Sequence, residues 1–281
     1  MYPELITLDL PILGTITITS FGVMMALSFL TGFWIVRVEL RRKGLDEELA
    51  GDVLMGAIIG GIVGAKIYYV LLNWPQTVQD PLGMLFSRAG LVWYGGFIGG
   101  AVGVIVAIRR RGARVPVLAD VCAPALALAY AVGRMGCFLV GDDYGRPTDS
   151  WVGIAFPNGS PPSTAGNLRR MFGVDVPASI PDSAVLAVHP TQLYEIGMSL
   201  LIFAILWRLR REPWKAGRLF ALWLALAGIE RLVVEFFRAK DDRFFGVLTL
   251  AQLISIGLVL FGGWLFVRLS DTSVGEASPG A

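Results

Sequence analysis

Apolar residues occur along this chain in seven long runs, separated by short segments that collect most of the charged and turn-forming residues. A helix that crosses the hydrocarbon core of a bilayer needs about 20 mostly apolar residues, and each run has roughly that length. The runs cover residues 14–36, 50–72, 91–108, 117–139, 190–207, 218–237 and 247–267. The pattern therefore predicts an all-α integral membrane protein with seven transmembrane helices.

The segment 140–188 differs from everything around it. It contains the sequence PNGSPP at 157–162 and further turn formers, which favour irregular structure. We predict a small extracytoplasmic insertion here, between spans four and five. Nothing resembles a separate soluble domain, so residues 1–281 are expected to form a single polytopic membrane domain. The N-terminus lacks the basic region and cleavage site of a signal peptide, so the first span is expected to be retained.

Composition supports the membrane interpretation. Hydrophobic residues make up 55% of the 281 residues and charged residues only 16%, with a mean hydropathy of +0.64. Soluble domains carry about 25% charged residues, so an ordinary soluble globule and a disordered chain are excluded. The formal net charge of +2 also excludes nucleic-acid binding driven by overall charge. The lipid bilayer is the expected partner, and no nucleic acid is expected.

Lysine and arginine are divided unevenly between the two sets of loops. Cytoplasmic loops of membrane proteins carry an excess of these residues, so the richer set is predicted to be cytoplasmic. This places the N-terminus and the 140–188 insertion outside and the C-terminus in the cytoplasm. The richer set has 14 members: Arg37, Arg41, Arg42, Lys43, Arg109, Arg110, Arg111, Arg114, Arg208, Arg210, Arg211, Lys215, Arg218 and Arg268. The poorer set has 7: Arg88, Arg146, Arg169, Arg170, Arg238, Lys240 and Arg243.

The remaining three basic residues, Lys66, Arg134 and Arg231, lie inside predicted spans. Ionisable groups within a membrane are costly and usually face the protein interior or a water-filled cavity, so they are functional candidates. Each lies late in a span that runs from inside to outside, which places all three in the outer half of the bilayer. Glu195 lies early in the fifth span, which runs inward, so we expect it at the same depth.

Span six carries a charged face. Arg231, Glu235 and Arg238 are four and three residues apart, so they share one side of a helix. Guanidinium groups bind oxyanions through paired hydrogen bonds, and Arg134 is expected at the same depth. We favour an anion site, suited to a lipid phosphate, over the alternative of an internal ion-pair lock that stabilises the bundle.

Two polar blocks border the insertion. The sequence GRMGCFLVGDDYGR at 133–146 contains glycines that allow close approach of the backbone to a ligand or to another helix. For the adjacent Asp142 and Asp143, a solvated loop is favoured over an acid–base pair or a pair of metal ligands. The sequence HPTQLYE at 189–195 places Thr191, Gln192 and Glu195 on one helix face. This polar stripe is interpreted as a site wall, with structural hydrogen bonding between helices as the alternative.

Other motifs argue against cofactor chemistry and for close helix contacts. One histidine makes a zinc-hydrolase HExxH motif impossible, and no Walker, GxSxG or dinucleotide motif occurs, so no metal and no cofactor are expected. Glycines recur every fourth residue at positions 56, 60 and 64 and again at 95, 99 and 103. These repeats are interpreted as close helix contacts in spans two and three.

Taken together, these blocks resemble the signature of bacterial phosphatidylglycerol–prolipoprotein diacylglyceryl transferases. The resemblance rests on residues 133–148, 189–195 and 231–238 and on the Tyr94-Gly95-Gly96 start of span three. It implies a transferase of lipoprotein biosynthesis in the bacterial cytoplasmic (inner) membrane. Such an enzyme moves the diacylglyceryl group of phosphatidylglycerol onto the lipobox cysteine thiol of a prolipoprotein. A thioether forms and glycerol phosphate is released.

The resemblance also implies roles for individual residues. Arg134 matches the signature arginine of the family and Arg231 an essential arginine of span six, and Glu235 and Arg238 match the carboxylate and second arginine that follow. Arg134 and Arg231 are expected to hold the lipid phosphate, and Glu235 to orient Arg231. The expected catalytic residues are Arg134, Arg231, Tyr94 and Glu235. The expected substrate-binding residues are Arg134, Gly136, Asp142, Gly145, Arg146, Glu195 and Arg238.

The chain departs from the family pattern at several positions. Tyr94 stands where some members have histidine, and Phe21 where some have tyrosine. Cys137 and Val140 replace asparagines of the signature, and Asp142 replaces its common glutamate. If the family histidine activates the thiol, this chain uses Tyr94, Asp142 or solvent instead. A transporter or a lipid-binding membrane protein with an outer-leaflet anion site is the alternative function.

Overall fold

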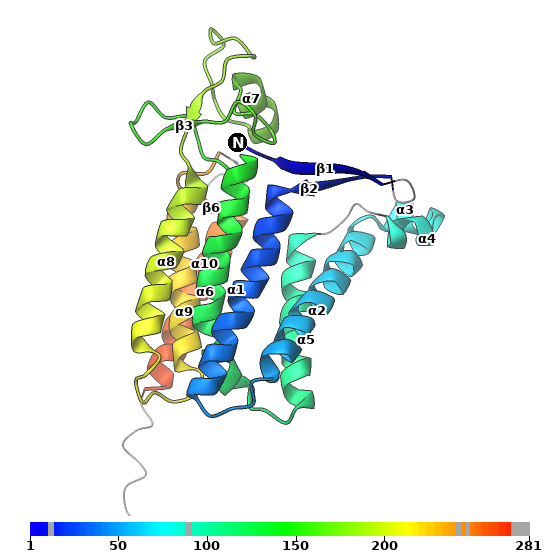
Figure 1. Cartoon of the computed structure of the whole chain (residues 1–281). Coiled ribbons are helices and arrows are strands. Elements are labelled where there is room, and N and C mark those ends of the chain that lie inside the picture. Colours follow the sequence, from blue (N-terminus) through cyan, green and yellow to red (C-terminus); the bar gives the residue numbers. More distant parts are fainter. Residues whose placement is uncertain (11–13, 88–91, 240–242, 245–247, 271–281) are drawn as a thin grey trace, which may run out of the picture. The chain divides into compact units, whose positions relative to one another are not determined.

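The computed structural model describes residues 1–10, 14–87, 92–239, 243–244 and 248–270. Arg88 and Lys240, assigned above to the outer loops, and the C-terminal tail at 271–281 lie outside the described residues. The chain divides into two compact units, one formed by Met1–Gly32 with Ala123–Ala281 and the other by Phe33–Cys122. Figure 1 labels the helices and most of the strands of both units.

The structure is mostly helical. Its helices are α1 (Ser20–Arg42), α2 (Leu49–Leu72), α3 (Trp74–Gln79), α4 (Pro81–Phe86), α5 (Trp93–Arg110), α6 (Val115–Val140), α7 (Ala165–Phe172), α8 (Thr191–Leu209), α9 (Arg218–Glu235) and α10 (Leu250–Arg268). Its strands form three antiparallel pairs: β1 (Glu4–Leu10) with β2 (Gly14–Thr19), β3 (Ile154–Ala155) with β4 (Ala187–Val188), and β5 (Arg243–Phe244) with β6 (Leu248–Thr249).

Five of the described helices are long and apolar enough to cross a membrane, namely α1, α2, α6, α8 and α10. Helices α5 and α9 also match predicted spans, and each has 18 residues. Two arginines end α5, and α9 carries arginine and glutamate within its length, which lowers the hydropathy of both. The chain is therefore a multi-pass helical membrane protein.

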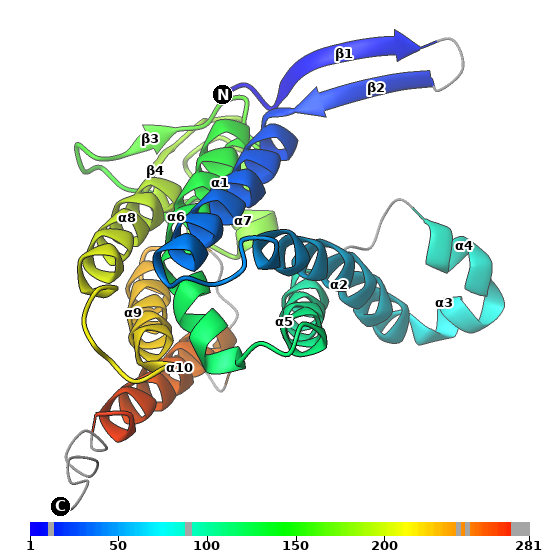
Figure 2. The same ribbon diagram turned by 60° about the horizontal axis from the view of Figure 1, so that its bottom comes forward.

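The predicted start of the first span is wrong. Residues 14–19 form β2, which pairs with β1 in a register that places Ile6 opposite Ile18 and Thr7 opposite Thr17; Figure 2 shows the two strands side by side. The sequence TITIT alternates β-branched residues, which favour strands. The Thr19 hydroxyl then accepts a hydrogen bond from the Gly22 amide at 3.1 Å, which caps the beginning of α1.

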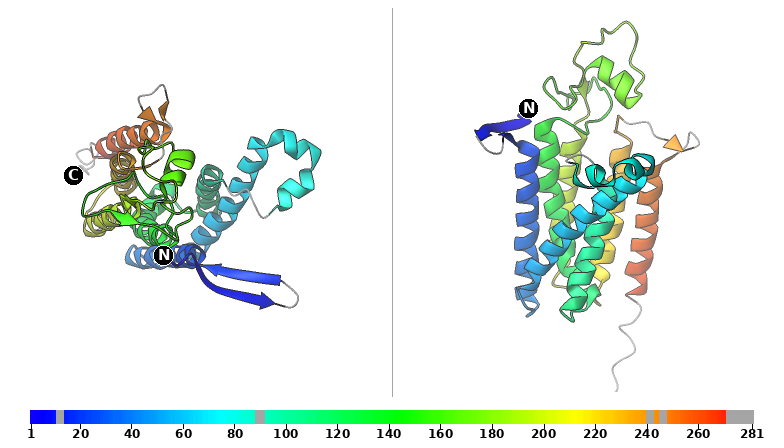
Figure 3. Two further views of the ribbon diagram at one scale, coloured as in Figure 1. Left: turned by 90° about the horizontal axis from the view of Figure 1, so that it is seen from above. Right: turned by 90° about the vertical axis from the view of Figure 1, so that its right-hand side faces the viewer.

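The second unit is held together by the glycine repeats. Gly56, Gly60 and Gly64 on α2 meet the repeat at 95, 99 and 103 on α5, and Figure 3 shows the two helices crossing. A Cβ on Gly99 would lie 2.7 Å from the Gly64 Cα, so only glycine permits this approach. The prediction of close helix contacts in spans two and three is confirmed.

In the first unit, α6, α8, α9 and α10 run alongside one another (Figures 1 and 3). One cluster of their core packs Ala123 and Ala127 of α6 against Ile202 and Leu206 of α8 and Leu219 of α9. On α10, side chains such as Leu260, Phe261 and Trp264 remain exposed, as expected of a helix that contacts lipid.

Residues 141–190 extend beyond the end of the bundle where α6 stops and α8 begins (Figure 1). This segment has a small core of its own, in which Tyr144, Phe156, Leu168 and Val188 are buried. The rings of Tyr144 and Phe156 stack with their centroids 5.4 Å apart. The segment therefore packs as an ordered cap, and its first and last residues reach the helix ends that carry the charged groups.

The glycine contact gives a testable prediction for stability. Gly99→Ala places a methyl group against the α2 backbone and should reduce the free energy of unfolding by about 1–3 kcal/mol. Gly51→Ala is the matched control, because a Cβ at Gly51 meets nothing within 4 Å and alanine favours helix by up to about 1 kcal/mol. Denaturant titration in detergent, followed by circular dichroism, measures both. Equal stability of the two variants would contradict the contact.

Candidate functional site

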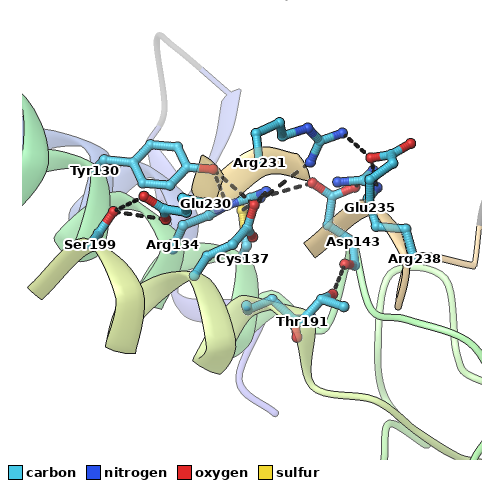
Figure 4. A network of polar contacts seen from close by, with 12 residues as sticks. Tyr130, Arg134, Cys137, Asp143, Thr191, Ser199, Glu230, Arg231, Glu235 and Arg238 are labelled. Carbon is cyan, nitrogen blue, oxygen red and sulfur yellow. Dashed lines mark hydrogen bonds and ion pairs between the residues drawn. The ribbon is translucent and has the colours of Figure 1, made fainter. Parts of the chain in front are cut away.

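A cluster of arginines and carboxylates lies at the end of the bundle beneath the 141–190 segment. Arg134 comes from the last turns of α6 and Glu195 from the first turn and a half of α8. Arg231 and Glu235 come from the end of α9, Arg238 follows α9, and Asp143 follows α6. Figure 4 shows most of these side chains pointing toward one another. Three helix ends that are distant in sequence thus supply one polar site.

Glu195 is the centre of the cluster. Its Oε1 atom accepts hydrogen bonds from Arg134 Nη2 at 2.5 Å and from the Tyr130 hydroxyl at 2.9 Å. Arg231 Nη1 lies 3.7 Å from the same oxygen. The Glu195 side chain is only 1% exposed. A buried charge is tolerated only when it is paired and hydrogen-bonded, and here two guanidinium groups pair with one carboxylate. The structure therefore brings Arg134, Arg231 and Glu195 together.

The charged face of α9 forms the second part of the cluster. Arg231 Nη2 lies 2.7 Å from Glu235 Oε2, and Arg238 Nε lies 3.8 Å from the same oxygen. These pairs have the four-residue and three-residue spacing from which one shared face was predicted. Glu235 is almost completely buried, and its carboxylate pairs with the Arg231 guanidinium. Arg231 itself remains 30% exposed and can reach a ligand.

Asp143 forms the third part. The sequence favoured a solvated loop for Asp142 and Asp143, and this prediction is wrong for Asp143, because two arginines bind its carboxylate. Its Oδ2 accepts from Arg134 Nη1 at 2.9 Å, and its Oδ1 accepts from Arg238 Nη2 at 2.8 Å. Partial burial opposes ionisation of this carboxyl, but the charges of Arg238 and Arg134 outweigh it and hold the pKa of Asp143 at about 2. Asp143 therefore stays ionised at neutral pH, and the cluster contains three arginines balanced by three carboxylates.

Backbone contacts fix the positions of Asp143 and Arg238. The Gly145 amide donates to the His189 carbonyl at 2.8 Å, and the Arg146 amide donates to the Phe237 carbonyl at 2.8 Å. Arg146 Nε also donates to the Arg238 carbonyl at 2.9 Å. Gly145 is required here, because a Cβ would lie 2.8 Å from that of His189. The expected site residues Gly145 and Arg146 thus tie the cap to the end of α9.

The polar stripe at the start of α8 supports the same loop. The Thr191 hydroxyl donates to the Asp143 carbonyl at 2.6 Å, and the Gln192 amide donates to the Asp142 carbonyl. Both side chains are fully buried. This stripe therefore holds the backbone of the acidic loop, while Glu195, one turn further along α8, engages the arginines.

Other expected site residues lie apart from the ion pairs. Gly136 faces α1, where a Cβ would lie 3.0 Å from the Met24 Cβ, so it permits close helix packing. The Asp142 carboxylate takes no part in the salt bridges of the cluster, and its Oδ1 is buried without a hydrogen-bond partner. Burial, with the charge of Asp143 adding to it, raises the pKa of Asp142 to about 6.

Two expected residues belong to the second unit. Tyr94 lies in the first turn of α5 and is 41% exposed. Lys66 lies on α2, and its Nζ donates to the Ser87 carbonyl at 2.8 Å and to the Ser87 hydroxyl at 2.9 Å. The expectation that Lys66 and Tyr94 lie at the depth of the arginines stays a prediction.

Tyr130 and Glu230 are further polar residues that sequence reasoning missed. The Tyr130 hydroxyl accepts from Arg134 Nε at 3.1 Å while it donates to Glu195. Its position four residues before Arg134, on the same helix face, was the available signal. Glu230 is buried and accepts from the Ser199 hydroxyl at 2.9 Å. No spacing rule connects Glu230 with Ser199, because the two residues lie on different helices.

The central role of Glu195 can be tested through stability. Glu195→Gln keeps the shape of the side chain but leaves Arg134 and Arg231 with one charge fewer to balance them, which should cost about 3–5 kcal/mol of unfolding free energy. Glu212→Gln is the matched control, because Glu212 is exposed and lies 3.9 Å from the highly exposed Arg208. Unfolding in detergent measures both variants. A Glu195→Gln protein as stable as the control would contradict the compensated cluster.

Comparison with known proteins identifies the family. A family model described as "Prolipoprotein diacylglyceryl transferase" matches residues 9–268. A phosphatidylglycerol–prolipoprotein diacylglyceryl transferase of Geobacter sulfurreducens is 34% identical over 276 residues, covering 94% of this chain and 95% of that protein. The enzyme of the same name from Clostridium tetani is 31% identical over 250 residues, covering 89% of this chain and 92% of that protein. The chain belongs to the prolipoprotein diacylglyceryl transferase family.

Proposed function

We propose that this chain transfers the diacylglyceryl group of phosphatidylglycerol to the lipobox cysteine thiol of a prolipoprotein. The sulfur–carbon bond of a thioether forms as the carbon–oxygen bond to the phosphate breaks, and glycerol phosphate leaves with the bonding electrons. The observation that carries the proposal is the convergence of Arg134 and Arg231 on Glu195, in a chain that matches the family over most of its length.

The arginines supply the positive charge that this reaction needs. A phosphate leaving group gains negative charge as the carbon–oxygen bond breaks, and fixed donors that face this charge lower the barrier. Arg134 and Arg231 bind the phosphate in our account, and Glu235 keeps Arg231 in orientation. Arg238 contacts the phosphate at the edge of the same site. Glu195 pairs with both Arg134 and Arg231 and so holds them side by side. The nucleophile is the thiol of the substrate, so the chain needs none of its own.

We further propose that seven helices, α1, α2, α5, α6, α8, α9 and α10, cross the membrane as one polytopic domain. The excess of Lys and Arg in one set of loops supports an N-terminus outside and a C-terminus in the cytoplasm. The 141–190 cap would then lie on the extracytoplasmic side of a bacterial inner membrane, next to the arginine cluster. The bacterial origin of the relatives supports this location.

An apolar groove between α8 and α9 is our candidate for an acyl-chain site. It is an open groove of about 570 Å³, and its lining includes Leu193, Met198, Leu201, Val233 and Phe237. Phe237 directly precedes Arg238, so one end of the groove lies next to the charged cluster. Apolar walls beside a few fixed charges are typical of sites for amphipathic ligands.

Reconstitution tests the activity. We expect the protein, supplied with phosphatidylglycerol and a lipobox peptide, to form the thioether product, detected by mass spectrometry. Arg134→Ala and Arg231→Ala should each lower kcat by about 100-fold or more, because each removes a donor that faces the leaving phosphate. Arg134→Lys should retain part of the rate, since it keeps the charge and loses the planar fork.

Arg170→Ala is the control for these variants, because Arg170 is an exposed arginine of the cap, paired with Asp182. Its rate should equal that of the wild type. A lipid-binding protein or an anion transporter would form no thioether. Absence of product from well-folded wild type would therefore exclude the transferase reaction.

We propose Asp142 as the group that takes the thiol proton. Its pKa of about 6 lies close to neutral pH, which suits a general base, and its buried Oδ1 has no partner. Below pH 6 this carboxyl is protonated and accepts no proton, so kcat/KM should rise with pH through about 6. Asp142→Asn should abolish that rise, measured as the pH dependence of product formation.

Tyr94→Phe tests Tyr94 as the alternative acceptor of the thiol proton. The variant removes the phenol oxygen and leaves the Asp142 carboxylate in place. We expect Tyr94→Phe to keep the rise near pH 6. A rise near pH 6 that persists in Asp142→Asn would exclude Asp142, and loss of turnover in Tyr94→Phe would return Tyr94 to the catalytic position expected from the sequence.

A further inference from the structure

Asp143 occupies the position between two arginines that an oxyanion would take. Its two carboxylate oxygens bind different guanidinium groups, Arg134 at 2.9 Å and Arg238 at 2.8 Å. A phosphate uses the same donors in the same manner, since both anions accept paired hydrogen bonds from arginine. Asp143 is therefore an internal anion on Arg134 and Arg238, one central and one peripheral arginine of the proposed phosphate site.

Asp143 differs from the other two carboxylates of the cluster in its accessibility. Its side chain is 40% exposed, whereas those of Glu195 and Glu235 are 1% and 3% exposed and lie within helices. Asp143 belongs to the loop after α6, where its backbone has a φ of 57° and its carbonyl is held by Thr191. The backbone is thus held by this hydrogen bond, so the carboxylate can leave the arginines only by side-chain rotation.

We propose that the Asp143 carboxylate competes with the lipid phosphate, and with the glycerol phosphate product, for Arg134 and Arg238. This inference rests on the proposed phosphate site. When a phosphate binds, Asp143 turns outward but remains tethered nearby, and its like charge weakens the hold of the arginines on the anion. The product phosphate carries more charge than the lipid diester, so the effect is larger on the product. Asp143 therefore sets the affinity of the site and favours product release.

Asp143→Asn tests this competition. Asparagine tolerates positive φ, so the loop geometry is retained while the charge is removed. We expect the KM for phosphatidylglycerol and the inhibition constant of added glycerol phosphate both to fall, the latter by about tenfold, the size expected when one charge-assisted competitor is lost. Asp143→Gly, which also suits positive φ, removes the side chain entirely and should lower the inhibition constant at least as far.

The matched control is Asp182→Asn. Asp182 belongs to the same cap and also bridges two arginines, Arg169 and Arg170. The variant therefore removes an equal charge and an equal kind of contact outside the cluster. Its KM and its inhibition constant should equal those of the wild type. Equal decreases in both variants would show a general effect of net charge and would overturn the proposal.

Two further outcomes would overturn the inference in distinguishable ways. An unchanged or raised inhibition constant in Asp143→Asn and Asp143→Gly would show that Asp143 holds the arginines in place instead of competing with phosphate, and the phosphate site would stand. If glycerol phosphate inhibits neither wild type nor variants while the thioether still forms, the phosphate site itself is misplaced. Thermal stability of each variant, measured alongside, identifies any loss of folding.

Discussion

The contact between the buried Glu195 carboxylate and two guanidinium groups is the interaction on which the rest of the site depends. Within a bilayer, an unpaired charge costs several kcal/mol or more, so Arg134 and Arg231 require an anion inside the protein. Glu195 meets that requirement by bringing the ends of α6, α8 and α9 to one point. The same contact that stabilises the bundle therefore sets the distance between the two arginines that we propose bind the phosphate.

The cap completes this arrangement from outside the bundle. Backbone hydrogen bonds at Gly145, Arg146 and His189 join its first residues to the segment before α8 and to the segment after α9. Those bonds place Asp143 against Arg134 and Arg238, so the cluster is neutral as a whole. Pairing lowers the cost of burying these charges, and we propose that a phosphate replaces the exposed Asp143 carboxylate. Stability and anion binding are in this way served by the same charges.

Much of this organisation follows from the sequence, because its causes are local or periodic. Seven apolar runs predicted seven long helices, and the glycine repeats at 56–64 and 95–103 predicted the contact of α2 with α5. The positions of Arg134, Glu195 and Arg231 late or early in oppositely directed spans predicted a common depth. The strand at 14–19 was hidden, because a β-branched apolar segment also fits the start of a span. Asp143 was unpredictable, because its role depends on a left-handed turn and on Arg238, 95 residues away.

We propose that Arg134 and Arg231 hold the phosphate of phosphatidylglycerol. An experimental structure of the protein with a phosphatidylglycerol analogue that cannot transfer its diacylglyceryl group tests this most directly. The account predicts the phosphate within hydrogen-bonding distance of both guanidinium groups, with the Asp143 carboxylate turned away from Arg134. A phosphate bound elsewhere in the protein, with the ion pairs of Arg134 and Arg231 unchanged, would contradict it.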